Sequence, residues 1–557
     1  MVWTAITAAA WCVAGCTLPE AARLRLADGV EKPPRNVVIF FADGLDVQRL
    51  REILDAGLLP NIRRTFLEGG VEIRDAIAAM PAVTYPNCST VVTGLYPGHH
   101  DILGNFWFDR DRLLVRCYMT LDTARDVNHD LRRTTLYDVL SDRLTVSLLA
   151  QTHRGVTASF DLKPDFDRAW ILGRYLDADR AVGETFLDVV DLANRVRRWP
   201  TVLMTYYPAI DEIGHRQGPD SSEYAAALTH LDRTVGRVTA AMNTLGLSRS
   251  TYYALISDHG MAPIEPGQDF GLIRWLQAHR RMKVLNSPLR EADYAGRYEA
   301  MQHYDAIATV DAGRVAMVHL RGRGWVHRPE PGEVRAWAKT PPAVHELPAV
   351  EMVASRAGPN RAAVWSRTGS LVVERRVQDE RCLYRLAQYV GDPLLIKGEP
   401  RLSRFAGLSG ADSGVGSERG WHDSREWLAA TATSRYPDLV PQVVEMFDSP
   451  HTGDLVVFAA DGWLLYPNEV AGHGSTLHRD MHVPMFFAGP DLPAGTQVPV
   501  GRLVDFMPTL LGLLSESRRL ESFPPIDGID LSDELRRAVA PPPEPLPPPT
   551  PPRRLER

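Results

Sequence analysis

Short apolar runs separated by helical patterns constrain the fold of this chain more than any other feature. The segments 36–41 (NVVIFF), 201–207 (TVLMTYY) and 251–257 (TYYALIS) are almost continuously apolar. Such runs are typical of strands buried on both faces, as in a parallel sheet covered by helices. Amphipathic helical patterns occur between them, at 177–198 and 223–245. The alternation predicts a doubly wound, mostly parallel α/β sheet with helices on both faces.

The pattern divides the chain into a core and an insertion. Between residues 267 and 450 the strand and helix signals become short and irregular, without a sharp motif. We expect an α+β cap there, inserted into a core formed by 36–266 and 451–535. The apolar run DLVVFAA, which ends at residue 460, is expected to return to the core. The tail 541–557 is rich in Pro and is expected to be extended.

Composition and charge exclude two classes of protein. The net charge of −7 provides no basic surface, so we expect no binding of nucleic-acid duplexes. No apolar run reaches the roughly 18 residues that a membrane-spanning helix needs. Any link to a membrane would therefore come from a lipid anchor.

The N-terminal stretch suggests such an anchor. Residues 1–16 (MVWTAITAAAWCVAGC) are apolar and end in small residues before Cys16. VAGC resembles the lipobox of bacterial lipoproteins, which predicts lipidation of Cys16 and a periplasmic or envelope location. The alternative is a ragged N-terminus with incidental cysteines. Cleavage would leave Cys88, Cys117 and Cys382, and the sequence does not say whether any two of them pair.

Carboxylate and imidazole side chains gather where the predicted strands end. The candidates are Asp43 after the first strand, Asp211 and His215 after the second, Asp258 and His259 after the third, and His473 ahead of a later one. Open α/β sheets carry their sites at the carboxyl ends of strands. Singly, each residue is ordinary in a turn, but together they suit zinc and similar divalent ions. Their joint placement predicts a metal centre.

The stretch from Met80 to Asn105 is the predicted reaction centre. Thr84 stands two residues before Pro86, which is tolerated in a first helical turn because its missing N–H would have no partner there. A hydroxyl at this place lies beside unpaired backbone N–H groups and the positive end of the helix dipole, which favours anions. The alternative is that Thr84 is only an N-cap.

These motifs together resemble one superfamily. NVVIFFADGL, the stretch around Thr84, YYPAIDEIGHRQGPDS, LISDHGM and the later HGS and DMHVPMFFAGP are similar to the alkaline phosphatase superfamily, above all its nucleotide pyrophosphatase/phosphodiesterase branch. The resemblance covers roughly 36–261 and 454–530, in family order. It implies a doubly wound α/β fold with a two-metal centre, usually zinc.

The resemblance also implies roles for individual residues. One Zn²⁺ would be held by Asp211, His215 and His473, and the second by Asp43, Asp258, His259 and the Thr84 hydroxyl. Asn105 matches a family Asn whose amide donates to a phosphoryl oxygen. His478 and His482 remain alternatives for His473.

A covalent phosphothreonine at Thr84, hydrolysed by water, is the implied mechanism. A metal would activate the hydroxyl, and backbone N–H groups after Thr84 would add charge stabilisation. The expected substrates are small phosphodiesters or nucleotide pyrophosphates. Tyr85 and Tyr207 are candidates for lining a pocket for a base or aryl group. Arg154 stands in QTHRGV, where a related monoesterase branch has Lys-x-Arg for the extra phosphate charge, although Thr152 replaces the Lys here. The alternative is that Arg154 is a solvated loop residue.

Other functions stay open at this point. A phosphomonoesterase, a phosphonate hydrolase or a phospho-group transferase would use the same ligands. Sulfatases share the fold, but their nucleophile derives from Cys or Ser, and Thr84 stands at that place here. From a different class, the chain could be a non-catalytic envelope lipoprotein that binds a partner, and the complete ligand set argues against this.

Overall fold

The computed structural model describes residues 33–120, 123–160, 164–289, 291, 293–379, 381–408 and 420–540. The predicted lipidation site Cys16 and the Pro-rich tail 541–557 lie outside the described residues. Within the described ranges, no helix is both long enough and apolar enough to cross a bilayer.

The main sheet has the strand order β20-β2-β21-β8-β1-β7-β5-β6, with β22 beside β2. Its strands are β1 (Asn36–Ala42), β2 (Gly70–Ile77), β5 (Thr145–Leu148), β6 (Ala158–Phe160), β7 (Val202–Tyr207), β8 (Thr251–Ile256), β20 (His482–Val483), β21 (Met485–Ala488) and β22 (Thr496–Arg502). The run β8-β1-β7-β5-β6 is parallel, and β21 pairs antiparallel with both β8 and β2. The predicted doubly wound, mostly parallel sheet is confirmed in a mixed form.

Both faces of this sheet are buried, as the apolar runs predict. Successive side chains of a strand point to opposite faces. In β1, the odd-numbered Val37, Ile39 and Phe41 join one hydrophobic core, and the even-numbered Val38 and Phe40 join another. Each face therefore needs apolar residues, which explains why the run shows no polar alternation.

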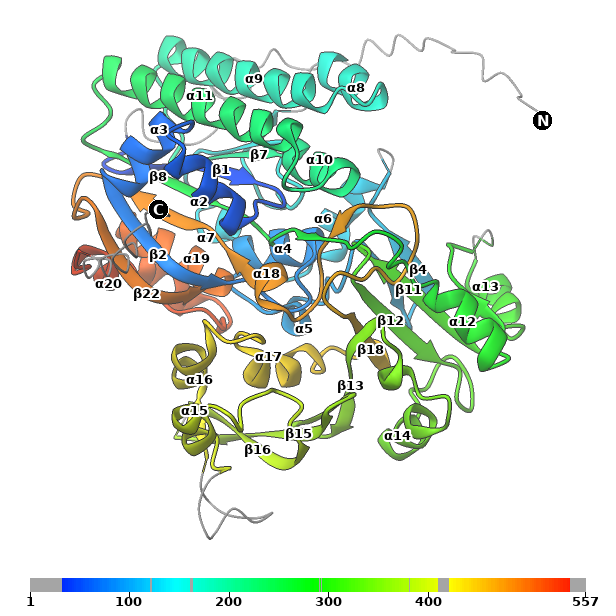
Figure 1. The fold of residues 1–557 in the computed structure, drawn as a ribbon. Coiled ribbons are helices and arrows are strands. Elements are labelled where there is room, and N and C mark those ends of the chain that lie inside the picture. Colours follow the sequence, from blue (N-terminus) through cyan, green and yellow to red (C-terminus); the bar gives the residue numbers. More distant parts are fainter. Residues whose placement is uncertain are drawn as a thin grey trace, which may run out of the picture.

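Helices cover the two faces, as Figure 1 shows. One face is covered by α2 (Val47–Asp55), α9 (Tyr175–Val196), α10 (Ala209–Gln217) and α11 (Ser222–Thr244). The other is covered by α4 (Thr84–Thr93), α7 (Leu136–Val139) and α19 (Phe506–Leu513). The other helices of this part are α3 (Pro60–Ile62), α5 (Pro97–His100), α6 (Val127–Asp130), α8 (Pro164–Ile171), α18 (His478–Met481) and α20 (Ser532–Arg536).

A second sheet lies below the main one in Figure 1, with the order β10-β11-β12-β18-β13-β14-β15-β16-β17. Its strands are β10 (Val284–Leu285), β11 (Ala306–Asp311), β12 (Val315–Leu320), β13 (Val350–Gly358), β14 (Arg361–Ser366), β15 (Gly369–Gln378), β16 (Arg381–Gly391), β17 (His422–Asp423) and β18 (Leu455–Ala459). Its helices are α12 (Leu272–His279), α13 (Tyr294–Met301), α14 (Pro331–Lys339), α15 (Pro400–Phe405), α16 (Ser424–Thr431) and α17 (Leu439–Met446). Small pairs are β3 (Phe106–Asp109) with β4 (Leu114–Cys117), and β9 (Ala262–Pro263) with β19 (Ala471–Gly472).

The position of β18 corrects the sequence expectation. The run that ends at residue 460 was expected in the core formed by 36–266 and 451–535, but β18 pairs antiparallel with β12 and β13 of the second sheet. Its Val456 and Phe458 face one core and Val457 the other, so β18 is buried on both sides. A strand with two buried faces has the same apolar pattern in either sheet, and the pattern therefore does not specify its partners.

The second sheet shares a core with the main sheet. Val315 and Met317 of β12 belong to the hydrophobic cluster that contains Ile39 of β1 and the helices α16 and α17. The opposite face of the second sheet packs on α12 and α14. Because of this shared core, the inserted segment is packed into the molecule rather than attached at its surface.

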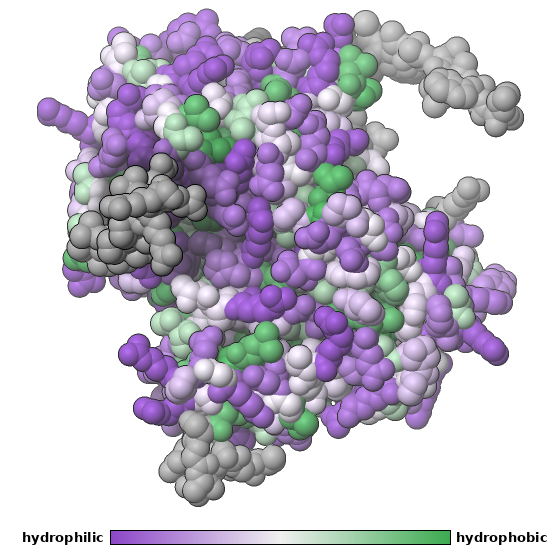
Figure 2. All heavy atoms as spheres, viewed as in Figure 1, coloured by the Kyte–Doolittle hydropathy of each residue, from purple (hydrophilic) through white to green (hydrophobic). Residues whose placement is uncertain are grey.

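Hydrophilic residues dominate the surface seen in Figure 2, and apolar ones are scattered in small groups.

Candidate active site

The carboxyl ends of β1, β7 and β8 bring distant residues together. Asp43 follows β1, Asp258 and His259 follow β8, and α10 begins two residues after β7. Because these strands are adjacent and parallel, their ends lie at the same edge of the sheet. The turn after β1 needs a glycine. Gly44 has φ +63°, and a Cβ there would lie 2.7 Å from the Oδ1 of Asp211.

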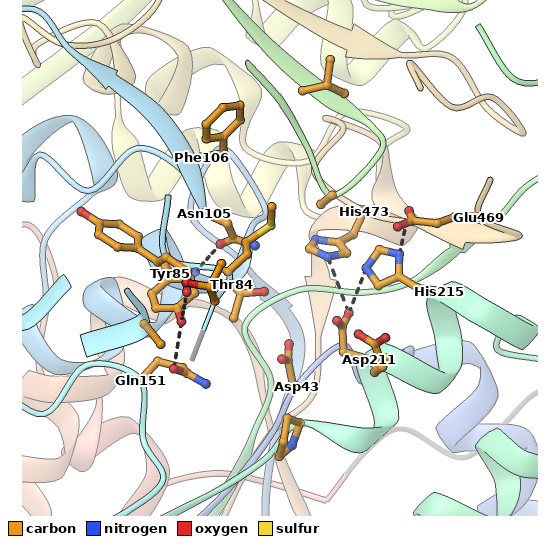
Figure 3. Close-up of a pocket in the computed structure, with 18 of the residues that line it drawn as sticks. Asp43, Thr84, Tyr85, Asn105, Phe106, Gln151, Asp211, His215, Glu469 and His473 are labelled. Carbon is orange, nitrogen blue, oxygen red and sulfur yellow. Dashed lines mark hydrogen bonds and ion pairs between the residues drawn. The ribbon is translucent and has the colours of Figure 1, made fainter. Parts of the chain in front are cut away.

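One set of ligands centres on Asp211 and is called the Asp211 group (Asp211, His215, His473). Asp211 Oδ1 lies 3.5 Å from His215 Nε2 and 3.6 Å from His473 Nε2. The other ring nitrogen of each histidine is occupied. His215 Nδ1 lies 3.0 Å from Glu469 Oε2 and 3.1 Å from the Ala471 carbonyl. His473 Nδ1 lies 2.8 Å from the Ala82 carbonyl, so in both rings Nε2 is the atom turned to Asp211 (Figure 3).

A second set is called the Asp258 group (Asp43, Asp258, His259, with the Thr84 hydroxyl). His259 Nε2 lies 3.3 Å from Asp43 Oδ1, 3.6 Å from Asp258 Oδ2 and 3.2 Å from Thr84 Oγ1. His259 Nδ1 lies 2.9 Å from the Gly260 carbonyl. The two groups touch, because the rings of His259 and His473 stack with centroids 3.3 Å apart. Every ligand that the sequence predicted is therefore in this cluster.

The cluster fits divalent cations. Among the described residues, Asp43 Oδ1, Asp211 Oδ1 and Asp258 Oδ2 are buried without a hydrogen-bond partner. Burying an ionised carboxylate is costly unless it is paired or binds a metal. Each of these atoms belongs to one of the two groups, and oxygen with imidazole nitrogen is a donor set that zinc and similar ions accept. The residues therefore match the metal ions that the resemblance implies.

The electrostatics of the cluster lead to the same conclusion. Burial, reinforced by Asp43, raises the pKa of Asp211 to about 7 and also raises the pKa of Asp258 well above its usual value. Burial alone would lower the pKa of His259, but Asp258 and Asp43 raise it to about 9. Burial lowers the pKa of His473, so its imidazole stays neutral, as a metal ligand must be. Burial would also lower the pKa of His215, but Asp211 and Glu469 raise it to about 10. The raised pKa values of His215 and His259 reflect the concentrated negative charge that attracts a cation.

Helix α4 presents the Thr84 hydroxyl to this cluster. The helix begins at Thr84 itself, and its N-cap is Val83, without a side-chain capping bond. Thr84 is therefore not an N-cap, and its hydroxyl is turned to His259 instead. A second expectation is also corrected: the backbone N–H groups after Thr84 are not free. Tyr85 N–H donates to Asn105 Oδ1 at 3.0 Å, Pro86 has no N–H, and Asn87 N–H donates to the Val83 carbonyl at 3.1 Å.

Asn105 lies beside Thr84 because it accepts the backbone N–H of the next residue, Tyr85. Its Oδ1 accepts from Tyr85 N–H, which leaves the Nδ2 end of the amide as the donor. Among the described residues none accepts a hydrogen bond from Nδ2. Asn105 and Phe106 donate their own backbone N–H groups to Asp311 Oδ2, at 2.6 Å and 3.2 Å. In Figure 3, Thr84 and Asn105 face Asp211, His215 and His473 across the opening.

A cavity of about 1330 Å³ opens onto the cluster. Tyr85 lines it as predicted, and its hydroxyl donates to Gln151 Oε1 at 3.0 Å. Neither Tyr207 nor Arg154 is among the described residues that line the cavity. Tyr206 lines it instead and donates its hydroxyl to Asp43 Oδ2. Neighbouring residues of a strand point to opposite faces, and because both faces of β7 are apolar the sequence does not say which Tyr faces the site.

Arg154 has a structural role rather than the predicted contact with substrate. Its Nη2 donates to Asp138 Oδ2 at 2.6 Å and to the Arg133 carbonyl. The alternatives to His473 are also set aside, because the rings of His478 and His482 pack edge to face on each other outside the cluster and His482 Nε2 lies 3.0 Å from the Arg74 carbonyl. Among the described cysteines, Cys88, Cys117 and Cys382 are free thiols.

Three residues of the site were missed by sequence reasoning. They are Glu469 behind His215, Tyr206 behind Asp43 and Asp311 behind Asn105. Each acts through another residue, so none carries a motif of its own. For Glu469 the available signal was its position four residues before His473. Asp311 gave no signal, because it lies in the inserted segment, 206 positions from Asn105.

Comparison with known proteins agrees with this geometry. An uncharacterized pyrophosphatase/phosphodiesterase of Schizosaccharomyces pombe is 27% identical over 286 residues, which cover 48% of this chain and 55% of that protein. Ectonucleotide pyrophosphatase/phosphodiesterase family member 1 of Mus musculus is 28% identical over 295 residues, covering 52% of this chain and 31% of that protein. The matched stretch thus spans between about a third and about half of these relatives' own lengths.

A solved structure and a family model extend the comparison. The fold of murine ectonucleotide pyrophosphatase/phosphodiesterase 5 matches with a TM-score of 0.54 and 14% identity, covering 91% of this chain and 100% of that one. The model of the family described as type I phosphodiesterase / nucleotide pyrophosphatase matches residues 37–376. Since that match extends over more than half of the sequence, the chain belongs to the type I phosphodiesterase/nucleotide pyrophosphatase family.

Proposed function

We propose that this chain hydrolyses phosphodiester or nucleotide pyrophosphate bonds through a phosphothreonine at Thr84, in a site that holds two zinc ions. The observation that supports it most is the position of Thr84 Oγ1, 3.2 Å from His259 Nε2 and within the ligand cluster at the wall of the cavity. Relatives point the same way, among them venom phosphodiesterase 2 of Crotalus adamanteus, 27% identical over 241 residues. An inactive threonine-to-alanine variant of the murine structural neighbour binds AMP.

The Asp211 group would hold one ion, and the Asp258 group with Thr84 Oγ1 would hold the other. When bound, such ions act as Lewis acids that lower the pKa of a coordinated hydroxyl and neutralise charge on phosphoryl oxygens. The protein orients the imidazole rings that would bind these ions. Carbonyl and carboxylate partners hold the Nδ1 side of His215, His259 and His473, so that each Nε2 is directed into the cluster.

Thr84 is the nucleophile in this proposal. Its Oγ1 attacks phosphorus, the bond from phosphorus to the leaving oxygen breaks, and the proton of the hydroxyl ends on that oxygen. Water then cleaves the phosphothreonine, which restores the hydroxyl and releases a phosphate monoester. Asn105 Nδ2 donates to a phosphoryl oxygen, where charge develops in the transition state. Because the N–H groups after Thr84 are occupied, Asn105 carries more of this stabilisation than the sequence suggested.

The surroundings of the phosphate favour a diester over a monoester. A monoester carries an extra negative charge, and Arg154 is the residue that sequence comparison offered to meet it. That guanidinium is paired with Asp138 away from the cavity. The size of the cavity, about 1330 Å³, leaves space for a group on each side of the phosphorus. The predicted envelope location and the lipid anchor at Cys16 stay predictions.

The test is a comparison of three substrates and three proteins. The zinc-loaded wild type, Thr84→Ala and Thr84→Ser are assayed with an aryl phosphodiester, an aryl phosphomonoester and a dinucleoside pyrophosphate, while metal content is measured in each. We expect the wild type to prefer the diester or pyrophosphate, Thr84→Ala to lose turnover while keeping most of its metal, and Thr84→Ser to retain part of the activity. A strong monoester preference, or an active Thr84→Ala protein, would contradict the proposal.

A further inference from the structure

Asp311 connects the second sheet to the reaction centre. It is the last residue of β11, is 6% exposed, and accepts the backbone N–H groups of Asn105 and Phe106 on Oδ2. The loop is packed tightly against this oxygen. A Cβ added at Gly104 would lie only 2.5 Å from Asp311 Oδ2. One carboxylate oxygen that accepts two consecutive backbone N–H groups restrains where the loop lies. Burial raises the pKa of Asp311 to about 7, and the two N–H donors oppose that rise.

The contact continues through Asn105 to the residue that follows Thr84. Asp311 holds the backbone of Asn105, and the Oδ1 of Asn105 in turn accepts from Tyr85 N–H. With backbone and Oδ1 both held, the direction of the Nδ2 donor is set. Asn105 lies on a connection between α5 and β3, so no helix or strand holds its backbone N–H, and Asp311 accepts it instead.

The turn after β11 also reaches the other side of the cluster. The Ala312 carbonyl accepts from His473 N–H at 3.0 Å, and Gly313 forms a β-bridge with His473. Arg314 forms an ion pair with Asp480 at 2.8 Å, with both side chains fully buried. A single turn of the second sheet, 311–314, therefore contacts the Asn105 loop and the His473 loop, which lie on opposite sides of the opening in Figure 3.

We propose that Asp311 is a positioning residue that holds Asn105 where its amide meets the transition state, which makes the second sheet part of the reaction centre. This rests on the proposed phosphodiesterase function. The side chain of Asp311 hydrogen-bonds neither Thr84 nor a proposed metal ligand, and its hydrogen bonds from the site come from the loop that carries Asn105. Replacing Asp311 should then lower kcat more than it raises KM. The misplaced Asn105 amide would stabilise the transition state less, while substrate binding would change little.

A double-mutant cycle separates this role from a general effect on folding. Asn105→Ala, Asp311→Ala and the double variant are compared with wild type on an aryl phosphodiester. Removing such a donor typically lowers kcat by roughly 100-fold. We expect Asp311→Ala to approach the loss in Asn105→Ala, and the double variant to be no slower than Asn105→Ala. Multiplied losses, or an Asp311→Ala protein as active as wild type, would overturn the proposal.

A second pair of variants tests the same contact from its other side. Gly104→Ala should lower kcat because its methyl group displaces the Asp311 carboxylate, and the loss should not multiply with that of Asp311→Ala, which vacates this space. Asp311→Asn, which keeps the shape of the side chain and one acceptor oxygen, should fall between wild type and Asp311→Ala, and it serves if Asp311→Ala folds poorly. A Gly104→Ala protein with unchanged kcat would count against the proposal.

The matched control is Asp305→Ala. Asp305 precedes β11 at its other end and accepts a backbone N–H from Lys283 at 2.9 Å, as Asp311 does from Asn105, but it lies away from the cavity. Its kcat and KM should equal those of wild type, with the metal content unchanged in every variant. A wild type without diesterase activity would refute the proposed function and this inference together. An active wild type with a slow Asn105→Ala and a fast Asp311→Ala would refute the inference alone.

Discussion

Replacing Glu469 by Gln should weaken one bound metal ion and leave the other unchanged. Glu469 Oε2 lies 3.0 Å from His215 Nδ1, and its Oε1 accepts from the Tyr466 hydroxyl at 2.5 Å. Burial opposes ionisation of this carboxyl, but the hydrogen bonds from His215 and Tyr466 and the nearby charges hold its pKa below the usual value. An ionised partner behind a metal-binding imidazole makes that imidazole a better ligand.

The size of the effect follows from the contacts that would remain. Losing such a partner usually costs 10-fold to 100-fold in metal affinity, in rough terms. Gln keeps the shape of Glu, and the Ala471 carbonyl still lies 3.1 Å from His215 Nδ1, so the ring should keep its orientation. The side chain is also 22% exposed, which lets water screen the lost charge. We therefore expect the lower end, about tenfold or about 1.4 kcal/mol.

Competition with a chromophoric zinc chelator measures the two affinities separately. In Glu469→Gln, the ion at the Asp211 group should bind about tenfold more weakly, and the ion at the Asp258 group should bind as in wild type. Glu426→Gln is the matched control, because Glu426 Oε2 also lies beside a histidine, 3.6 Å from His422 Nδ1, away from the cavity. Equal weakening of both ions, or no change in either, would refute the argument that Glu469 acts through His215.

Two further substitutions test the fold around the site. Burial lowers the pKa of His99, but hydrogen bonds to Asp448, Asp527 and Glu445 raise it to about 12. Protonated His99 therefore stabilises the folded protein fully below the unfolded pKa of about 6.5. This contribution to the free energy of unfolding is lost as pH rises toward 12. Urea unfolding should therefore show wild type losing up to about 1.4 kcal/mol per pH unit above pH 7 relative to His99→Gln, and parallel curves would disprove this. Gly44→Ala should lose metal and activity because its Cβ would lie 2.7 Å from Asp211 Oδ1. Gly246→Ala, with φ +69° and nothing within 4 Å, should show only the backbone strain, and equal metal loss in both variants would argue against a steric cause.

Most Asp and His residues of the cluster could be predicted from the sequence, because they follow apolar runs that are typical of buried strands. The runs ending before Asp43, Asp211 and Asp258 became β1, β7 and β8, which are neighbours in the main sheet. Placement after a parallel strand was enough to bring these carboxylates together. His473 was a candidate from its place ahead of a later strand, and the structure brings it to the cluster from beyond the inserted segment.

Residues that act through another residue could not be predicted in this way. Tyr206 and Tyr207 are both aromatic and both buried, so their sequence pattern is the same on either face of β7. Only the packing of the sheet shows that Tyr206 reaches Asp43. The occupied N–H of Tyr85 is a similar case, because its acceptor comes from Asn105, on a separate loop.

The class of fold, the strands that border the site and the candidate side chains of the site could all be read from the sequence. These depend on local pattern: apolar runs that need two buried faces, and polar residues at their ends. The tertiary structure alone decided the rest. It placed β18 in the second sheet, joined the two sheets in one core and brought Asp311 to Asn105 across 206 positions. Contacts of that kind arise from the packing of whole elements, and side chains so far apart in the chain leave no local pattern that records them.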